Sequence, residues 1–141
     1  MSGSAVERRL LQIVVALTCT VPLSAGILGV IESAGFVRGA PDLLPIDLDS
    51  HFRYLSGLLL GIGLLFLVSL PRIEIHGTLY RILGFIILVG GFSRLLSLVE
   101  HGPPGRGHVF GLVMELLVVP LIVLWQARIA RRSRAAAMSR P

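Results

Sequence analysis

Two charged residues inside otherwise apolar stretches are the best placed of all to do chemistry. Arg94 lies near the end of one apolar run, and Glu115 lies near the start of the next. At 1.5 Å of rise per residue, both lie roughly 8–11 Å from the same edge of these runs if the runs are helices. Because a lone charge at that depth is costly in an apolar environment, we expect Arg94 and Glu115 to form an ion pair.

Further polar side chains gather toward the same end of the apolar runs. A pocket built from them could hold a lipid head group, a quinone or another small amphiphile. The alternative is a structural cluster that fixes helix register and meets water at its rim. The candidate ligand-binding residues are Arg53, Tyr54, Arg94, Ser97, His101, His108 and Glu115.

Catalysis and metal binding have less support. The four histidines lie at the ends of the runs, without the i, i+3 or i, i+4 pairs of bundle metal sites: they are His51, His76, His101 and His108. No Cys-x-x-Cys or Gly-x-Ser-x-Gly motif occurs. We therefore predict no catalytic residue, metal or cofactor. An enzyme acting on a lipid-like substrate, with Glu115 and a histidine as acid and base, remains an alternative.

The apolar runs themselves indicate a membrane protein. Of 141 residues, 54% are hydrophobic and only 15% are charged, whereas soluble domains carry about a quarter charged residues. Four runs have roughly the 20 residues needed to cross a bilayer, at about residues 10–31, 52–70, 79–99 and 108–126. Short connections make consecutive helices antiparallel. We predict an all-α, up-down four-helix transmembrane bundle as one domain over 10–126, with a short segment 1–9 and a basic tail 127–141.

The charge distribution predicts the orientation. All 13 basic residues are arginine, and with both termini on one side that side holds nine of them against three on the other. Such a bias favours cytoplasmic termini, and an arginine-rich tail next to a span suits anionic lipid better than nucleic acid. The inner arginines are Arg8, Arg9, Arg72, Arg81, Arg128, Arg131, Arg132, Arg134 and Arg140, and the outer ones are Arg38, Arg53 and Arg106.

Small residues at helical spacing predict where helices pack closely, since backbones can approach where side chains are absent. The partner could be another helix of the same bundle or a second copy of the chain. The predicted packing residues are Ala25, Gly29, Gly57, Gly61, Gly90 and Gly91.

Several motifs together resemble domain of unknown function family 4345, small bacterial membrane proteins with four predicted spans. They cover about residues 14–128: His51-Phe52-Arg53-Tyr54-Leu55-Ser56-Gly57, Gly90-Gly91-Phe92-Ser93-Arg94-Leu95-Leu96-Ser97, Gly102-Pro103-Pro104, Glu115-Leu116 and Leu124-Trp125-Gln126. The resemblance implies the four-span topology and a bacterial inner membrane, and it brings no established activity.

Together these patterns favour a non-enzymatic accessory or stabilising component of a membrane assembly. The main alternative is a binder or carrier of a small lipophilic molecule. The expected partners are membrane lipids, and other membrane proteins or a second copy of the chain; nucleic acid is not expected.

Overall fold

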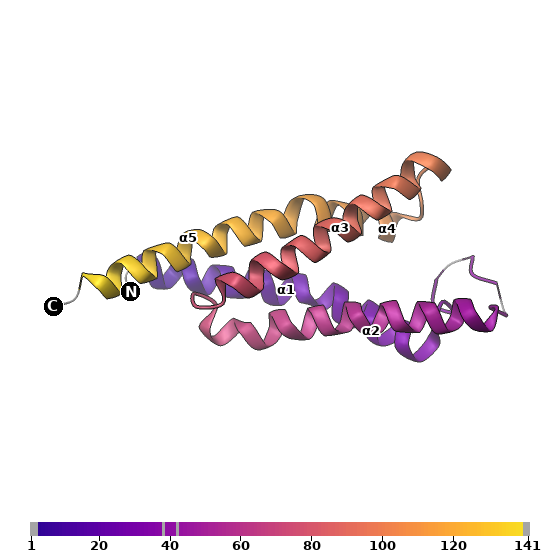
Figure 1. Ribbon diagram of the computed structural model, residues 1–141, viewed down its shortest axis with the longest axis horizontal. Coiled ribbons are helices and arrows are strands. Elements are labelled where there is room, and N and C mark those ends of the chain that lie inside the picture. Colours follow the sequence, from indigo (N-terminus) through magenta and orange to yellow (C-terminus); the bar gives the residue numbers. More distant parts are fainter. Residues whose placement is uncertain (1–2, 38, 42, 140–141) are drawn as a thin grey trace. The chain divides into compact units, whose positions relative to one another are not determined.

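Helices make up most of the chain (Figure 1). A computed structural model describes residues 3–37, 39–41 and 43–139. The helices are α1 (Gly3–Glu32), α2 (Ile46–Ser69), α3 (Gly77–His101), α4 (Arg106–Val113) and α5 (Val119–Met138). A 3-10 turn, Leu70–Arg72, follows α2, and a π-helical segment, Met114–Val118, joins α4 to α5. The described residues form no strand, so the all-helical prediction is confirmed for them.

Four helical stretches are long and apolar enough to cross a membrane. They are Ala5–Glu32, Ile46–Arg72, Gly77–His101 and Arg106–Met138. Large apolar side chains stay exposed along them, among them Leu17 at 65%, Phe85 at 67% and Leu124 at 65%. Soluble proteins rarely expose so much contiguous apolar surface, so these helices suit a lipid environment.

Helix α2 begins earlier than the predicted span. The predicted span begins at about residue 52, but the helix begins at Ile46, directly after Pro45. Proline pre-sets its own φ at the entry to a helix. The negative charges of Asp47 and Asp49 in the first turn interact favourably with the positive N-terminal end of the helix dipole. The connection between α1 and α2 therefore shortens to residues 33–45. Two residues counted in the charge bias, Arg38 and Arg140, lie outside the described residues.

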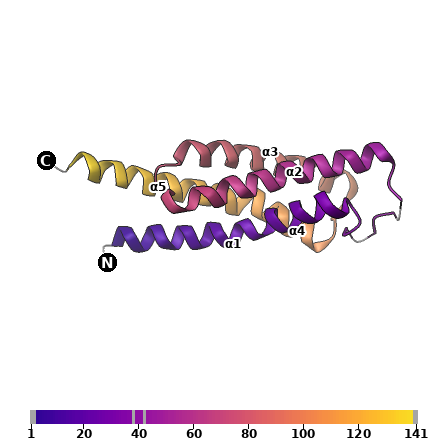
Figure 2. The same cartoon turned by 90° about the horizontal axis from the view of Figure 1, so that it is seen from below.

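The chain divides into two compact units, which we describe separately. The first, residues 13–70, is called the helix pair, and in it α2 runs antiparallel to α1 (Figures 1 and 2). The two helices approach closely at Gly26, where a Cβ atom would lie 2.8 Å from the backbone nitrogen of Leu60. Gly29 faces the Ser56 side chain in the same way. Missing side chains on α1 thus let α2 pack against its backbone.

The second unit, called the C-terminal unit, comprises residues 1–12 and 71–141. In it α3 packs against α5 and the π-helical segment. A Cβ at Gly84 would lie 2.6 Å from Val123 Cγ2, and one at Gly91 would lie 2.7 Å from Leu116 Cδ2. Gln126, 1% exposed, donates from Nε2 to the carbonyl of Ile73 at 2.8 Å. This bond holds the turn before α3 against α5.

The π-helical segment has a local cause. Pro120 follows it closely and has no backbone N–H, so the carbonyl of Leu116 lacks the partner that it would have in an α-helix. A proline ring also clashes with the carbonyl four residues earlier. Widening the helix over Met114–Val118 relieves both problems. The same widening contains Glu115.

Three of the predicted packing glycines have open surroundings. A Cβ at Gly57, Gly61 or Gly90 would meet no atom within 4 Å in the part of the chain that the structure describes. Gly29 and Gly91 are the predicted glycines with close neighbours, and Ala25 is half-buried. For Gly57, Gly61 and Gly90, a packing role stays a prediction about contacts with another chain.

Candidate functional site

Arg94 and Glu115 meet between α3 and the π-helical segment. Arg94 Nε lies 3.0 Å from Glu115 Oε2, and Arg94 Nη2 lies 3.0 Å from Glu115 Oε1. Two parallel N–H···O bonds make this a bidentate pair, which is stronger and more directional than a single contact. The side chains are 34% and 20% exposed, respectively. Both charged groups are therefore partly buried, and they neutralise each other.

His108 completes this group, which we call the Arg94 cluster (Arg94, His108 and Glu115). Its Nδ1 atom lies 3.0 Å from Arg94 Nη1. Because a guanidinium only donates hydrogen bonds, Nδ1 must accept, which requires a neutral ring with its proton on Nε2. Arg94 thus uses all three of its nitrogens within the cluster.

Local sequence explains why these side chains meet. Gly91 lies one turn before Arg94, and a Cβ there would be 3.0 Å from Glu115 Cβ. Gly111 lies one turn before Glu115, and a Cβ there would be 3.8 Å from Arg94 Cζ. The absent side chains let the two backbones approach, so the pair closes without long extension of either residue.

The other predicted site residues of the C-terminal unit lie outside the cluster. Ser97 is exposed. The His101 side chain is 76% exposed, and its Nδ1 atom lies 4.0 Å from Glu100 Oε2. Within this unit the structure brings together three of the predicted residues and leaves Ser97 and His101 on the surface.

Arg53 belongs to the helix pair, where it bridges α2 to the end of α1. Its Nε donates to Asp49 at 2.9 Å, and its Nη1 donates to the carbonyls of Val30 at 2.6 Å and Ile31 at 2.9 Å. The last carbonyls of a helix have no partner within it and carry the negative end of its dipole. Arg53 thus caps the carboxyl end of α1. Tyr54 beside it is 63% exposed.

This capping role gives a first prediction. Replacing Arg53 with lysine keeps the charge, but a single ammonium cannot reproduce the planar fork that reaches Asp49 and two carbonyls. We expect R53K to lower the free energy of unfolding by about 1–2 kcal/mol, measured by denaturant titration of the purified protein in mild detergent. R106K, at an exposed arginine, is the matched control. Equal stability of R53K and R106K would show that the cap is dispensable.

Two hollows of the molecule lie away from the Arg94 cluster. One of about 320 Å³ lies beneath the connection between α1 and α2 and is lined in part by Glu32, Ser33 and Asp49. Another of about 230 Å³ lies between the start of α1 and the end of α5. Arg94, His108 and Glu115 line neither. Among the described residues, no group of three or more histidine, cysteine or acidic side chains could hold a metal ion.

Some of the polar contacts were not predicted from the sequence. Asp49 is one turn before Arg53, and this i, i+4 spacing could have indicated the pair. Glu7 contacts both Arg128 and Arg132, and as the lone acid before the first apolar run it gave a weaker signal. The spacing of eleven residues places Gln126 on the same helix face as Glu115, but nothing in the sequence indicated the carbonyl of Ile73 as its partner.

Comparison with known proteins gives one match. The family model described as Domain of unknown function (DUF4345) matches residues 10–126, which include all four apolar runs and the whole Arg94 cluster. No curated protein matches the chain, and no solved structure does. The family match confirms the resemblance drawn from the sequence motifs.

Proposed function

The chain belongs to the DUF4345 family, and from the geometry of the Arg94 cluster we propose that it is a non-enzymatic accessory or stabilising component of a membrane assembly. The proposal places it in the bacterial inner membrane as a four-helix bundle with both termini in the cytoplasm. The four span-capable helices support insertion, and the excess of arginine near the termini supports the orientation.

The single observation that carries the proposal is the bidentate pairing of Arg94 with Glu115. Glu115, the acid that a membrane enzyme or proton carrier would need, is held by two bonds from Arg94. Gly91 packs against the Cβ atom of Glu115, and neither of the two hollows described above reaches Glu115. A matched and closely packed ion pair acts as a structural link between helices, whereas a ligand site needs an accessible concave space.

A specific observation also favours the alternative of a lipophile binder. His108 is exposed, and its Nε2–H is directed away from the bond that Nδ1 makes with Arg94. Glu115 lies in a π-helical segment, and such segments occur frequently at functional sites. A head group that accepts a hydrogen bond, such as a quinone carbonyl or a lipid phosphate, could therefore bind beside the cluster.

Co-purification separates the two functions. We would purify the protein at native abundance in mild detergent and identify bound proteins and small molecules by mass spectrometry, comparing the parent chain with H108A and with H51A as a control histidine. A stoichiometric protein partner kept in both variants supports the accessory role. A bound lipophile lost only in H108A supports the binder instead, and its presence without any protein partner would contradict the accessory role.

A further inference from the structure

The start of α1 and the end of α5 form a strongly basic region of the C-terminal unit. Residues 5–12, 71–81 and 126–139 contain eight arginines and only two acidic residues, Glu7 and Glu74. The acidic residues are both engaged: Glu74 with Arg8 at 3.2 Å, and Glu7 with two arginines of α5. The remaining arginines are Arg9, Arg72, Arg81, Arg131 and Arg134.

Glu7 holds the end of α5 in a defined position. It contacts Arg128 Nε at 3.6 Å and also Arg132, which lie one turn apart on the same face of α5. Ile129 and Ala130 are buried, at 5% and 4% exposure. The basic segment after the last apolar run is therefore a packed helix. The helix sets the side from which each arginine leaves the backbone, unlike in an unstructured tail.

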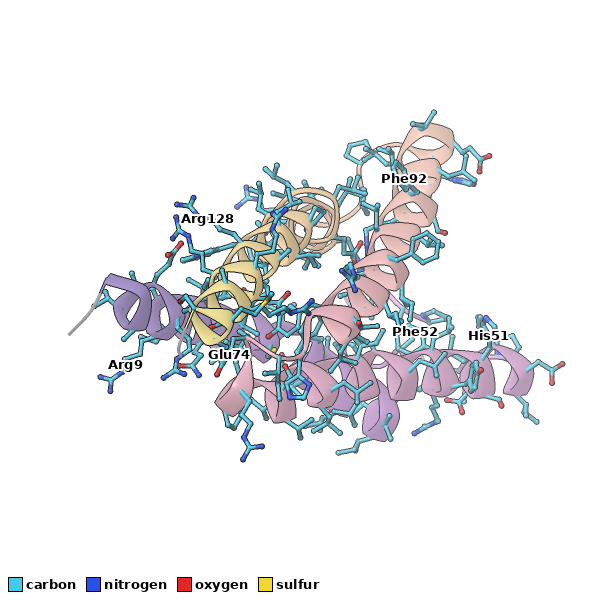
Figure 3. The ribbon with its side chains drawn as sticks, turned by 60° about the vertical axis from the view of Figure 1, so that its left-hand side comes forward. Arg9, His51, Phe52, Glu74, Phe92 and Arg128 are labelled. Carbon is cyan, nitrogen blue, oxygen red and sulfur yellow. The ribbon has the colours of Figure 1, made fainter. Side chains whose placement is uncertain are left out.

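Arg131 and Arg134 continue the basic surface of the same helix away from Arg132. At 100° per residue Arg131 lies about 60° from Arg128, and Arg134 lies about 60° further around the helix. Both are exposed, as is Arg9 on α1. Among the described residues none of these three takes part in an ion pair. Figure 3 shows Arg9 projecting away from the ribbon, at the end of the unit that also carries Arg128 and Glu74.

The length of the last helical stretch brings these arginines beyond the hydrocarbon. Arg106–Met138 has 33 residues, whereas about 20 residues cross the bilayer core. Roughly a dozen residues therefore extend past it, a distance comparable to the head-group layer and the water next to it. Guanidinium groups stay charged and offer planar pairs of donors that match phosphate oxygens.

We propose that Arg131 and Arg134 on α5, together with Arg9 on α1, bind the phosphates of anionic phospholipids in the adjacent leaflet. The inference rests on the proposed insertion of the chain into a membrane. It goes beyond the accessory role because it names the lipid class that this end of the protein selects. Glu7 contributes by neutralising Arg128 and Arg132, so that α5 can pack on α1 while Arg131 and Arg134 keep their charge without an acidic partner among the described residues.

Lipid selectivity tests the proposal. The protein is purified in mild detergent from membranes that contain phosphatidylglycerol and phosphatidylethanolamine, and the bound lipids are quantified by mass spectrometry. We expect phosphatidylglycerol to be enriched over its membrane fraction. In R131Q/R134Q the enrichment should fall by about five-fold per arginine removed. It should also fall in the parent protein at 1 M salt, where screening shortens the Debye length from about 10 to about 3 Å.

The single variant R106Q is the matched control for R131Q, because each removes one exposed arginine and Arg106 begins the same last helical stretch at its other end. It should keep the enrichment. Since Arg131 and Arg134 are exposed and make no ion pair with a described residue, we expect R131Q/R134Q to fold, and circular dichroism checks this. If that variant is unfolded, R131Q alone and the salt titration of the parent protein decide.

Three outcomes would overturn the inference. They are equal binding of the two phospholipids, unchanged enrichment in R131Q/R134Q, and retention of nucleic acid in place of lipid. Extraction of membranes with alkaline carbonate distinguishes these from failure of the proposed function. Release of the chain into the soluble fraction would contradict membrane insertion itself, whereas a chain that stays in the membrane without lipid selectivity contradicts only the lipid surface.

Discussion

Replacing Glu115 with glutamine is expected to lower the free energy of unfolding by about 3 kcal/mol. Removing one partner of a buried ion pair leaves the other charge without compensation, which costs about 3–5 kcal/mol in proteins. We expect the lower end of this range because the Arg94 side chain keeps 34% exposure. The loss is measured by titrating the purified protein from mild detergent into sodium dodecyl sulfate and following helicity and tryptophan fluorescence.

Two further variants make this prediction specific. E100Q removes a carboxylate from the end of helix α3, where the Glu100 side chain is 56% exposed and lies near His101. The stability of E100Q should therefore stay within about 0.5 kcal/mol of the parent. The exchange R94E/E115R should recover part of the loss in E115Q. Absence of any recovery, together with equal losses in E100Q and E115Q, would show that the direct pair does not stabilise the protein.

Simple helix geometry explains why this pair could be predicted from the sequence. The two residues lie at equal depth in consecutive antiparallel runs, and the cost of an isolated charge requires a partner. The same reasoning could not supply the details of the contact. The π-helical segment that contains Glu115 depends on how the helix adapts to Pro120. The contact between His108 and Arg94 depends on where the helix begins, since a start at Arg106 places His108 in its first turn.

Arg53 shows the limit of reasoning from residue type. Its charge near the end of a span suggested a ligand, because exposed arginines in such places often bind head groups. The structure gives it three acceptors within the helix pair: Asp49 and the carbonyls of Val30 and Ile31. A helix end needs capping wherever it occurs, but the sequence alone does not show which side chain reaches it, since the path of residues 33–45 decides that.

The glycines show in the same way that a sequence pattern does not determine which residues make the contact. Gly57 and Gly61 have the spacing of a helix-packing motif, yet the close approach within the helix pair occurs at Gly26 and Gly29. Gly26 was not predicted, although it lies three residues before Gly29 on the same face of α1. Spacing indicates which residues share a face, whereas the rotation of each helix about its axis depends on all the side chains packed between the two.

Replacing Gly26 with alanine is therefore expected to destabilise the helix pair by about 2–3 kcal/mol. The new methyl group would lie 2.8 Å from the backbone nitrogen and 2.9 Å from the Cα atom of Leu60. Backbone atoms of α2 cannot move aside as a flexible side chain can, so the two helices must separate along their contact. Overpacking of this kind costs about 1–3 kcal/mol, and the same detergent titration measures it.

The matched control is G57A, in the middle of α2. A Cβ at Gly57 would meet no described atom within 4 Å, and alanine favours a helix over glycine by up to about 1 kcal/mol. G57A should therefore be as stable as the parent protein or slightly more stable, although it changes the residue that best fits the packing motif. A large loss in G57A with none in G26A would mean that α2 presents its other face to α1, and the packing described for the helix pair would then be wrong.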